Sequence, residues 1–181
     1  MNTSIQAEFV KRTIPTYETG KPMDLPFFFE KRPYQGASGK IYPLQFNDNL
    51  TGNRVHKEYS VGVLENKYIR IEVMPEIGGK ISRGYDKLGE YDFMYHNAVV
   101  KPALIGLAGP WISGGIEFNW PQHHRPTTFL PLAASIEKHE DGSATLWTGE
   151  VDPLLRMKGM AGITVEPSRS YCRVKVRIFN R

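Results

Sequence analysis

Apolar and polar residues alternate with a period of two in several short segments, the pattern of half-buried β-strands. In Tyr68–Val73, three apolar residues alternate with an arginine and a glutamate, and in Tyr171–Phe179 three apolar residues alternate with three basic ones. Between them, Pro75–Lys80 (PEIGGK) predicts a turn, Ile81–Tyr85 its partner strand and Tyr91–Tyr95 a further short strand. These patterns indicate a β-rich chain.

The clearest predicted hairpin spans Ala134–Glu150. Its centre is Asp141-Gly142, a favoured two-residue turn, flanked by the candidate strands Ser135–His139 and Thr145–Thr148. No segment shows a helical period with capping residues. Short antiparallel strands separated by turns therefore predict an all-β fold, an antiparallel sandwich or barrel.

The first 58 residues are predicted to be an irregular segment that wraps the domain formed by residues 59–181. Prolines recur at positions 15, 22, 26, 33 and 43, and each removes a backbone donor and fixes its own φ. We therefore expect no long regular element there, and we expect the aromatic patch Phe27–Phe29 to anchor the segment in the core.

The sequence ends at Asn180-Arg181, directly after a strong strand pattern. A sheet that ends in this way exposes an edge or lacks a partner. We therefore expect the chain to be the N-terminal portion of a longer sandwich, inactive alone, and to form homo-oligomers through exposed strand edges.

Composition fits a packed globular protein, with 40% hydrophobic and 12% aromatic residues among 181. The net charge of +4 is spread along the chain, so it indicates a mildly basic surface and no nucleic-acid partner. The single cysteine, Cys172, excludes an internal disulfide and fits a reducing compartment. No signal peptide or membrane-spanning segment is evident, so the expected location is the cytoplasm, without a membrane partner.

The run Gly114–Arg125 (GGIEFNWPQHHR) carries the densest polar chemistry. Its paired glycines let the backbone approach a ligand closely. If Ile116–Trp120 forms a strand, Glu117 and Asn119 share one face, with three apolar residues on the other. A carboxylate beside a carboxamide suits sugar hydroxyls, which both donate and accept hydrogen bonds. An aromatic ring can cover the apolar face of a pyranose, and three are available: Trp111, Trp120 and Phe129.

A plainer interpretation stays open, in which the glycines form only a bulge and His123 and His124 are surface loop residues. Adjacent residues on a strand point to opposite faces, so these two histidines cannot easily share a metal ion. Spaced ligands typical of zinc sites, or of cupin-like metalloenzymes, are missing, and the other histidines stand isolated at positions 56, 96 and 139. We therefore expect no metal and no cofactor.

A second group of acid–base candidates follows the predicted hairpin. Two carboxylates that flank a glycosidic bond are the usual device for its hydrolysis, and Glu117 with Glu150 is the candidate pair. Arg156 lies shortly after and is a candidate for substrate binding. The alternative, a merely charged strand end at Glu150 and Asp152, also stays open. Further candidates of this kind are Glu76 and Asp86.

Four strings carry a specific resemblance: LENKYIRIEVMPEIGGKI, KPALIGLAGPWISGGIEFNWPQHHRPTTFLP, DGSATLWTGE and RMKGMAGITVEPSRSY. They closely resemble an uncharacterised N-terminal domain of large bacterial proteins, in which tetratricopeptide repeats commonly follow. That family is usually grouped with galactose-mutarotase-like (aldose epimerase-like) β-sandwich proteins. SGGIEFNWPQHHR is also similar to a Gly-Gly-Ile strip of hexose-phosphate epimerases, although the residues between the shared positions differ.

The resemblance implies a galactose-mutarotase-like sandwich that binds or transforms a sugar. Glu117, His123 and His124 are then the expected catalytic residues of an epimerase or glycoside hydrolase. The alternative function is a sugar-binding or scaffolding module without turnover. The residues expected to bind the sugar are Trp111, Asn119, Trp120, Gln122, Arg125, Glu150 and Arg156.

Overall fold

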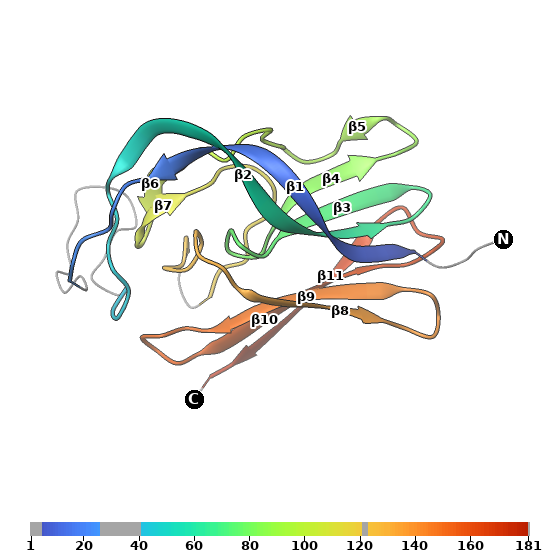
Figure 1. The fold of residues 1–181 in the computed structure, drawn as a ribbon. Coiled ribbons are helices and arrows are strands. Elements are labelled where there is room, and N and C mark those ends of the chain that lie inside the picture. The colour runs from blue at the N-terminus through green and yellow to red at the C-terminus, as the bar shows by residue number, and fades with distance from the viewer. Residues whose placement is uncertain (1–4, 26–40, 121–122, 181) are drawn as a thin grey trace.

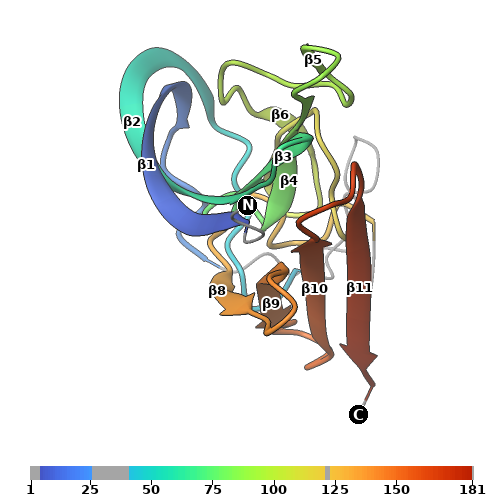
Figure 2. The ribbon, with the colours of Figure 1, turned by 90° about the vertical axis from the view of Figure 1, so that its right-hand side faces the viewer.

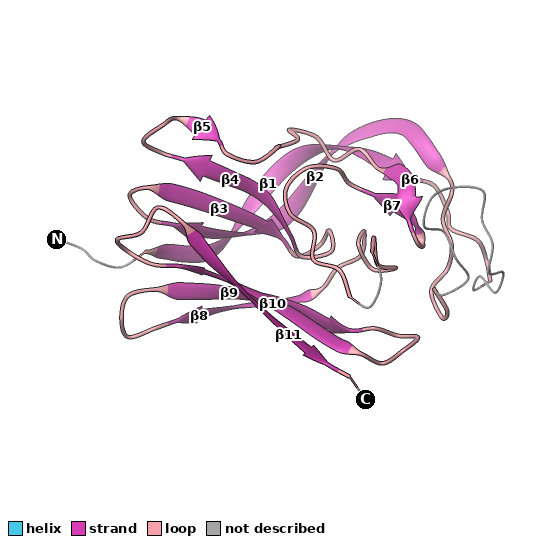
Figure 3. Ribbon diagram, turned by 180° about the vertical axis from the view of Figure 1, so that it is seen from behind, coloured by secondary structure: helices cyan, strands magenta, loops and turns pink. Residues whose placement is uncertain are grey.

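Residues 5–25, 41–120 and 123–180 are described by the computed structural model, and every regular element within them is a β-strand (Figure 3). The predicted all-β fold is confirmed, and the ribbon has two antiparallel sheets, one above the other (Figure 1). The first sheet has the order β1 (Gln6–Thr19), β2 (Leu50–Glu65), β3 (Ile69–Met74), β4 (Lys80–Asp86), β5 (Tyr91–Asp92). The second has the order β11 (Cys172–Phe179), β10 (Lys158–Val165), β9 (Ala144–Val151), β8 (Ala133–Lys138), and a small hairpin joins β6 (Ala103–Gly106) to β7 (Gly109–Trp111).

The main core lies between the two sheets. Alternate residues of β3, among them Ile71 and Val73, point into it from the first sheet. Leu146 of β9 and Ile163 of β10 meet them from the second sheet, and all four side chains are fully buried. The period-two pattern of the sequence thus gives each sheet one apolar face, and burial of these faces against each other holds the sandwich together.

The opposite face of the first sheet is also partly apolar. Val61 and Val63 alternate with the core residues of β2, and they pack with Val100 and Ile112 from the segment that crosses above this sheet. Figure 2 shows that the segment between β5 and β7 lies on the far side of the first sheet from β8–β11. The first sheet is therefore a central layer, and the candidate residues near position 112 lie in the loops that cover it.

The expectation of an irregular N-terminal segment is wrong, because β1 and β2 form a long antiparallel pair there. Pro15 lies inside β1, which is an edge strand. Its carbonyl accepts a hydrogen bond from Val100 on the edge away from β2, and Tyr17 donates to Val100 on that same edge. The missing donor of Pro15 therefore removes no bond between the two strands. The predicted anchor Phe27–Phe29 lies outside the described residues.

The predicted hairpin of β8 and β9 is confirmed, but its turn is longer than two residues. Residues 139–143 form it, with His139 and Ser143 hydrogen-bonded and Gly142 at φ 81°. The predicted strands at Tyr68–Val73, Ile81–Tyr85 and Tyr171–Phe179 are also present, as β3, β4 and β11. Of Tyr91–Tyr95, only the two residues of β5 form a strand.

The last strand, β11, is an edge strand whose apolar residues are not covered. Val174, Val176 and Ile178 share the inward side of the second sheet, yet 40–52% of each residue is exposed. In Figure 2, β11 stands at the outer end of the second sheet. The expected self-association through strand edges stays a prediction. Within the described ranges, no helix has the length and hydrophobicity that crossing a membrane requires.

Core and edge apolar residues should respond differently to truncation. Leu146→Ala removes a fully buried side chain from between the sheets, and we expect it to lower the free energy of unfolding by about 3 kcal/mol. Val174→Ala, on the exposed strand, is expected to change it by less than about 0.5 kcal/mol. Urea unfolding followed by tryptophan fluorescence measures both. A large loss in Val174→Ala that grows with protein concentration would show instead that a second copy covers β11.

Candidate functional site

The strip Gly114–Arg125 begins with a contact to β4 that only glycine allows. Gly114 and Gly115 have φ values of 83° and 65°, and a Cβ on Gly115 would lie 1.8 Å from the carbonyl oxygen of Ile81. Ile116 and Ile81 then exchange two backbone hydrogen bonds of 2.9 and 3.0 Å. The close approach that the glycines permit is therefore to the neighbouring strand, which fixes where the next residues project.

Beyond Ile116 the chain does not continue as the strand that we considered from the sequence. Ile116 forms an isolated bridge, and residues 117–119 have no ladder partner. The carbonyl of Phe118 accepts a hydrogen bond from the guanidinium of Arg125 instead. The strip thus folds back on itself, and this fold brings Glu117 close to His124.

Glu117 is held by three donors, so both of its carboxylate oxygens are occupied. Oε2 accepts hydrogen bonds from Trp111 Nε1 at 3.1 Å and from His124 Nδ1 at 2.9 Å. Oε1 accepts one from the hydroxyl of Thr128. Burial raises the pKa of Glu117, but the hydrogen bonds from Thr128, Trp111 and His124 outweigh it and leave the pKa below its usual value. Glu117 is therefore ionised at neutral pH.

His124 has one ring nitrogen fixed and one left over. Because Nδ1 donates to Glu117, Nε2 is the atom available to a ligand. The ring lies edge-on to the indole of Trp111, with centroids 5.3 Å apart, and 25% of the side chain is exposed. The backbone of His124 has φ 45°, a conformation that few residues other than glycine adopt. His123 is exposed, and its ring lies edge-on to that of His124, with centroids 5.6 Å apart.

Lys80 is a further candidate residue, which the sequence analysis did not identify. Its ammonium group donates to the carbonyl of Ile112 at 2.7 Å and lies 5.9 Å from the centre of the Trp111 ring. Burial lowers the pKa of Lys80 to about 8, and the charge of Glu117 partly opposes that effect. The sequence held one signal, a lysine after the paired glycines of PEIGGK, but nothing there showed its burial.

Arg125 is buried beneath this site and does not face solvent. Only 1% of its side chain is exposed, and its Nε lies 2.9 Å from a carboxylate oxygen of Glu150 on β9. The same Nε donates to the hydroxyl of Thr127, and Nη1 and Nη2 donate to the carbonyls of Phe118 and Gly78. Arg125 and Glu150 thus form an ion pair that joins the strip to both sheets.

The remaining predicted residues divide between this buried pair and a distant turn. Trp120 is 3% exposed and lies under the guanidinium of Arg125. The centre of its ring is 4.4 Å from the guanidinium carbon. Asn119 is exposed and its side chain accepts from the Arg125 amide. Arg156 lies apart, in the β9–β10 turn, where its amide donates to the carbonyl of Asp152. Gln122 lies outside the described residues.

The structure therefore assembles one compact group of candidate side chains: Trp111, Glu117, His123 and His124, with Lys80 and Thr128 beside them. Within the part of the chain that is described, no three residues of His, Cys, Asp or Glu gather in a way that could hold a metal ion. The chemistry that this group offers is proton transfer and hydrogen bonding.

Removal of the buried carboxylate should destabilise the fold. Glu150→Ala leaves the Arg125 guanidinium buried without its counter-ion, and we expect a loss of roughly 3 kcal/mol in the free energy of unfolding. Glu166→Ala is the matched control, since it breaks a more exposed pair with Arg173 and should cost less than about 1 kcal/mol. Urea unfolding measures the difference, and equal losses in the two variants would contradict a structural role specific to Glu150.

Lys80 should titrate close to neutral pH. In protein labelled with ¹³C at the lysine Cε, NMR should show one signal with a midpoint of about 8, which disappears in Lys80→Met. Glu117→Gln should lower that midpoint further, because the carboxylate charge favours the ammonium form. Glu58→Gln, at an exposed pair with Lys11, should leave it unchanged. A midpoint near 10.5, or an upward shift in Glu117→Gln, would show that Lys80 is not buried beside Glu117.

Comparison with known proteins places the chain in a family. A crystal structure of a TPR-domain containing protein from Parabacteroides distasonis superposes with a TM-score of 0.86 at 21% sequence identity. The match covers 99% of this chain and 30% of that one, so the shared fold is one part of a longer protein there. A family model described as "Domain of unknown function (DUF5107)" matches residues 37–180. Since the matched residues make up most of this chain, the chain belongs to the DUF5107 family.

Proposed function

We propose that the Glu117–His124 pair is the centre of a carbohydrate site, in a protein that transfers protons to and from a sugar. The observation that carries this proposal is the orientation of His124. A largely buried, ionised carboxylate fixes one ring nitrogen, and the other nitrogen is left for a ligand beside an indole ring. Carboxylate–histidine pairs of this kind are a common way to fix the tautomer of a catalytic imidazole.

The geometry suggests separate roles for the two residues. Glu117 has hydrogen bonds on both oxygens, which leaves it poorly suited to take a proton from a substrate. In this proposal it is a positioning residue. His124 Nε2 accepts the proton of the anomeric hydroxyl and gives it to the ring oxygen as the bond between that oxygen and the anomeric carbon breaks, and the reverse transfer closes the ring to the other anomer. Lys80, whose pKa of about 8 lies close to neutral pH, supplies a second titratable group near the same carboxylate.

Sugar recognition would rest on the side chains around His124. The indole of Trp111 offers an apolar surface for a pyranose face, and His123 and Asn119 are exposed on the same strip. Sugar sites typically combine an aromatic platform with a few polar groups of this kind. The sequence resemblance to galactose-mutarotase-like proteins supports the same substrate class, and the proposed chemistry is epimerisation at the anomeric carbon.

Hydrolysis by two carboxylates receives less support than epimerisation. The carboxylate of Glu150 is tied to Arg125 and Thr127, and only 12% of its side chain is exposed. A glycosidase needs two carboxyl groups that reach the substrate from opposite sides. The second candidate is sugar binding without turnover. One observation favours it. Among the described residues of the strip, only His124 combines a fixed tautomer with a ring nitrogen left for a ligand, whereas proton transfer at a sugar commonly uses an acid and a base.

Binding and turnover can be separated in one experiment. The full chain is titrated with a panel of neutral monosaccharides and followed by ligand-observed NMR, while the same spectra record the rate at which the anomers interconvert. We expect His124→Gln to abolish acceleration of that interconversion and Glu117→Gln to reduce it by about 10²-fold or more. His56→Gln, on β2, is the matched control and should behave as the unmodified chain.

The outcomes decide between the candidates. Saturable binding without acceleration, lost in His124→Gln, would establish the binding module. Acceleration that survives His124→Gln would remove His124 from the mechanism. No binding of any sugar in the panel would overturn the carbohydrate proposal as a whole.

A further inference from the structure

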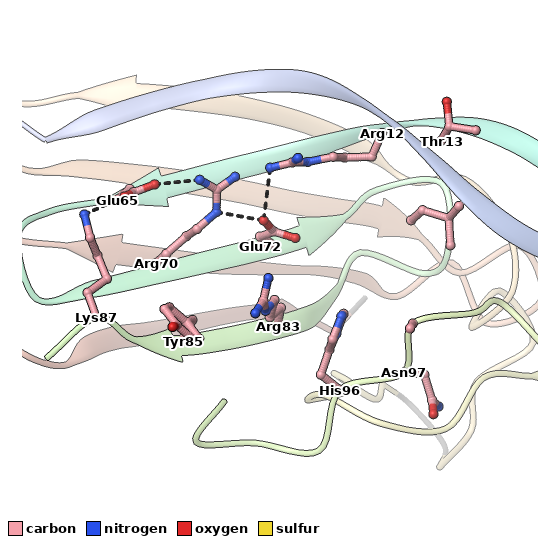
Figure 4. A pocket seen from close by; sticks show the side chains of 12 residues that line it. Arg12, Thr13, Glu65, Arg70, Glu72, Arg83, Tyr85, Lys87, His96 and Asn97 are labelled. Carbon is pink, nitrogen blue, oxygen red and sulfur yellow. Dashed lines mark hydrogen bonds and ion pairs between the residues drawn. The ribbon is translucent and has the colours of Figure 1, made fainter. Parts of the chain in front are cut away.

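A cavity lies on the outer face of the first sheet, away from the core between the sheets. Its volume is about 530 Å³, within the range of pockets that hold small molecules. The floor comes from β3 and β4, the strand β1 lies along one side, and His96 and Asn97 lie along the other (Figure 4). In the sequence analysis, Arg70 and Glu72 of this cavity appear only as the polar positions of a half-buried strand.

An alternating row of charges crosses the floor of this cavity. Lys87 Nζ lies 2.6 Å from Glu65, and Arg70 Nη1 lies 2.7 Å from the other oxygen of Glu65. Arg70 Nε also lies 2.7 Å from Glu72, and the guanidinium of Arg12 lies 3.5 Å from the same oxygen. Figure 4 shows this row as a line of dashed contacts. It begins and ends with a cation, so three positive charges share two negative ones.

The carboxylates lie deeper than the cations around them. Only 17% of the Glu65 side chain and 12% of the Glu72 side chain are exposed, against 46% for Arg12. Burial raises the pKa of Glu65, but the nearby Lys87 and Arg70 outweigh this and lower it, so the group stays ionised. Partly buried ion pairs gain little net stability, because desolvation offsets the attraction. The partial burial of Glu65 and Glu72 is therefore not explained by a gain in stability, and it distinguishes this cavity from an ordinary solvated strand face.

Two arginines keep donors that the row does not use. Within the described residues, Arg12 forms its ion pair with Glu72 and donates no hydrogen bond, although it stands at the cavity wall. Arg83 forms a bidentate pair with Asp92, through Nε at 2.6 Å and Nη2 at 3.2 Å, and lies over the ring of Tyr85, so Nη1 is the nitrogen that this pair leaves over. Four cations therefore meet three carboxylates around this cavity, which leaves an excess of one positive charge.

From this geometry we infer that the cavity binds a small anion that also carries hydroxyl groups, such as a sugar acid or a sugar phosphate. The planar fork of Arg12 suits a carboxylate or phosphate group, and Nη1 of Arg83 can add one further charge-assisted hydrogen bond. The carboxylates of Glu65 and Glu72 can accept hydrogen bonds from hydroxyls on the same molecule. This site is separate from the Glu117–His124 pair, and its existence does not depend on the function proposed for that pair.

The cavity and the strip are separate, but one residue of the cavity lining is hydrogen-bonded to the segment that leads into the strip. Asn97 lines the cavity and donates to the carbonyl and hydroxyl oxygens of Ser113, the residue before the paired glycines. His96 also lines the cavity, and its Nδ1 donates to the carbonyl of Ser82 at 3.0 Å. A ligand that contacts Asn97 would therefore touch a residue that is hydrogen-bonded to the segment leading to Glu117.

The test is a titration of the full chain with four probes: glucuronate, glucose 6-phosphate, glucose and inorganic phosphate, each measured by isothermal titration calorimetry. We expect one or both sugar anions to bind saturably and more tightly than inorganic phosphate. The anion that binds identifies the acidic group. Glucose is expected not to bind at this cavity.

Matched variants locate the binding. Arg12→Gln should weaken it about tenfold, since it removes one charge-assisted contact. Arg54→Gln removes the same charge from an exposed position on the neighbouring strand and should leave the affinity unchanged. His124→Gln should also leave the affinity of this cavity unchanged. The result of this titration is therefore independent of whether the function proposed for the Glu117–His124 pair is correct. Thermal unfolding of each variant confirms that the fold is retained.

Three outcomes would overturn the inference. One is the absence of saturable binding by either sugar anion. A second is binding of inorganic phosphate as tightly as of glucose 6-phosphate, which would exclude recognition of hydroxyls. The third is equal weakening by Arg12→Gln and Arg54→Gln, which would reduce the effect to general charge.

Discussion

The buried Arg125 guanidinium is the contact on which the arrangement of the candidate site depends. It reaches Glu150 on the second sheet, Gly78 in the turn between β3 and β4, and Phe118 within the strip. One side chain therefore joins both layers of the sandwich to the loop that carries Glu117 and His124. A charge in such a place is tolerated because all three guanidinium nitrogens donate to acceptors, and loss of the side chain would leave several buried acceptors unpaired.

The strand pattern was predictable because period-two alternation follows directly from the geometry of a half-buried strand. Ile69, Ile71 and Val73 fixed β3 in this way. The N-terminal strands were missed because proline was taken to exclude them. Pro15 is compatible with a strand since β1 is an edge, and edge position is a property of the tertiary fold that no local pattern reveals.

The candidate site was predictable in composition but not in arrangement. Glu117 and His124 stood out as polar residues in one short run, yet their pairing requires the strip to fold back, which depends on Arg125 taking the Phe118 carbonyl. Arg125 and Glu150 looked like ligand contacts because charged residues are usually exposed. Lys80, Thr128 and the charged row of the outer face come from distant segments, so only the fold brings them into view.

The edge strand β11 presents two rows of opposite character. Its apolar row, Val174, Val176 and Ile178, points inward, while Arg173, Lys175 and Arg177 form the other row. If a second copy paired antiparallel with this edge, the basic rows of the two copies would lie on one surface, where like charges directly across strands repel. The strand thus combines an attractive apolar surface with an electrostatic barrier against itself. That barrier would weaken as salt screens the repulsion, which makes ionic strength the variable that governs how this edge behaves.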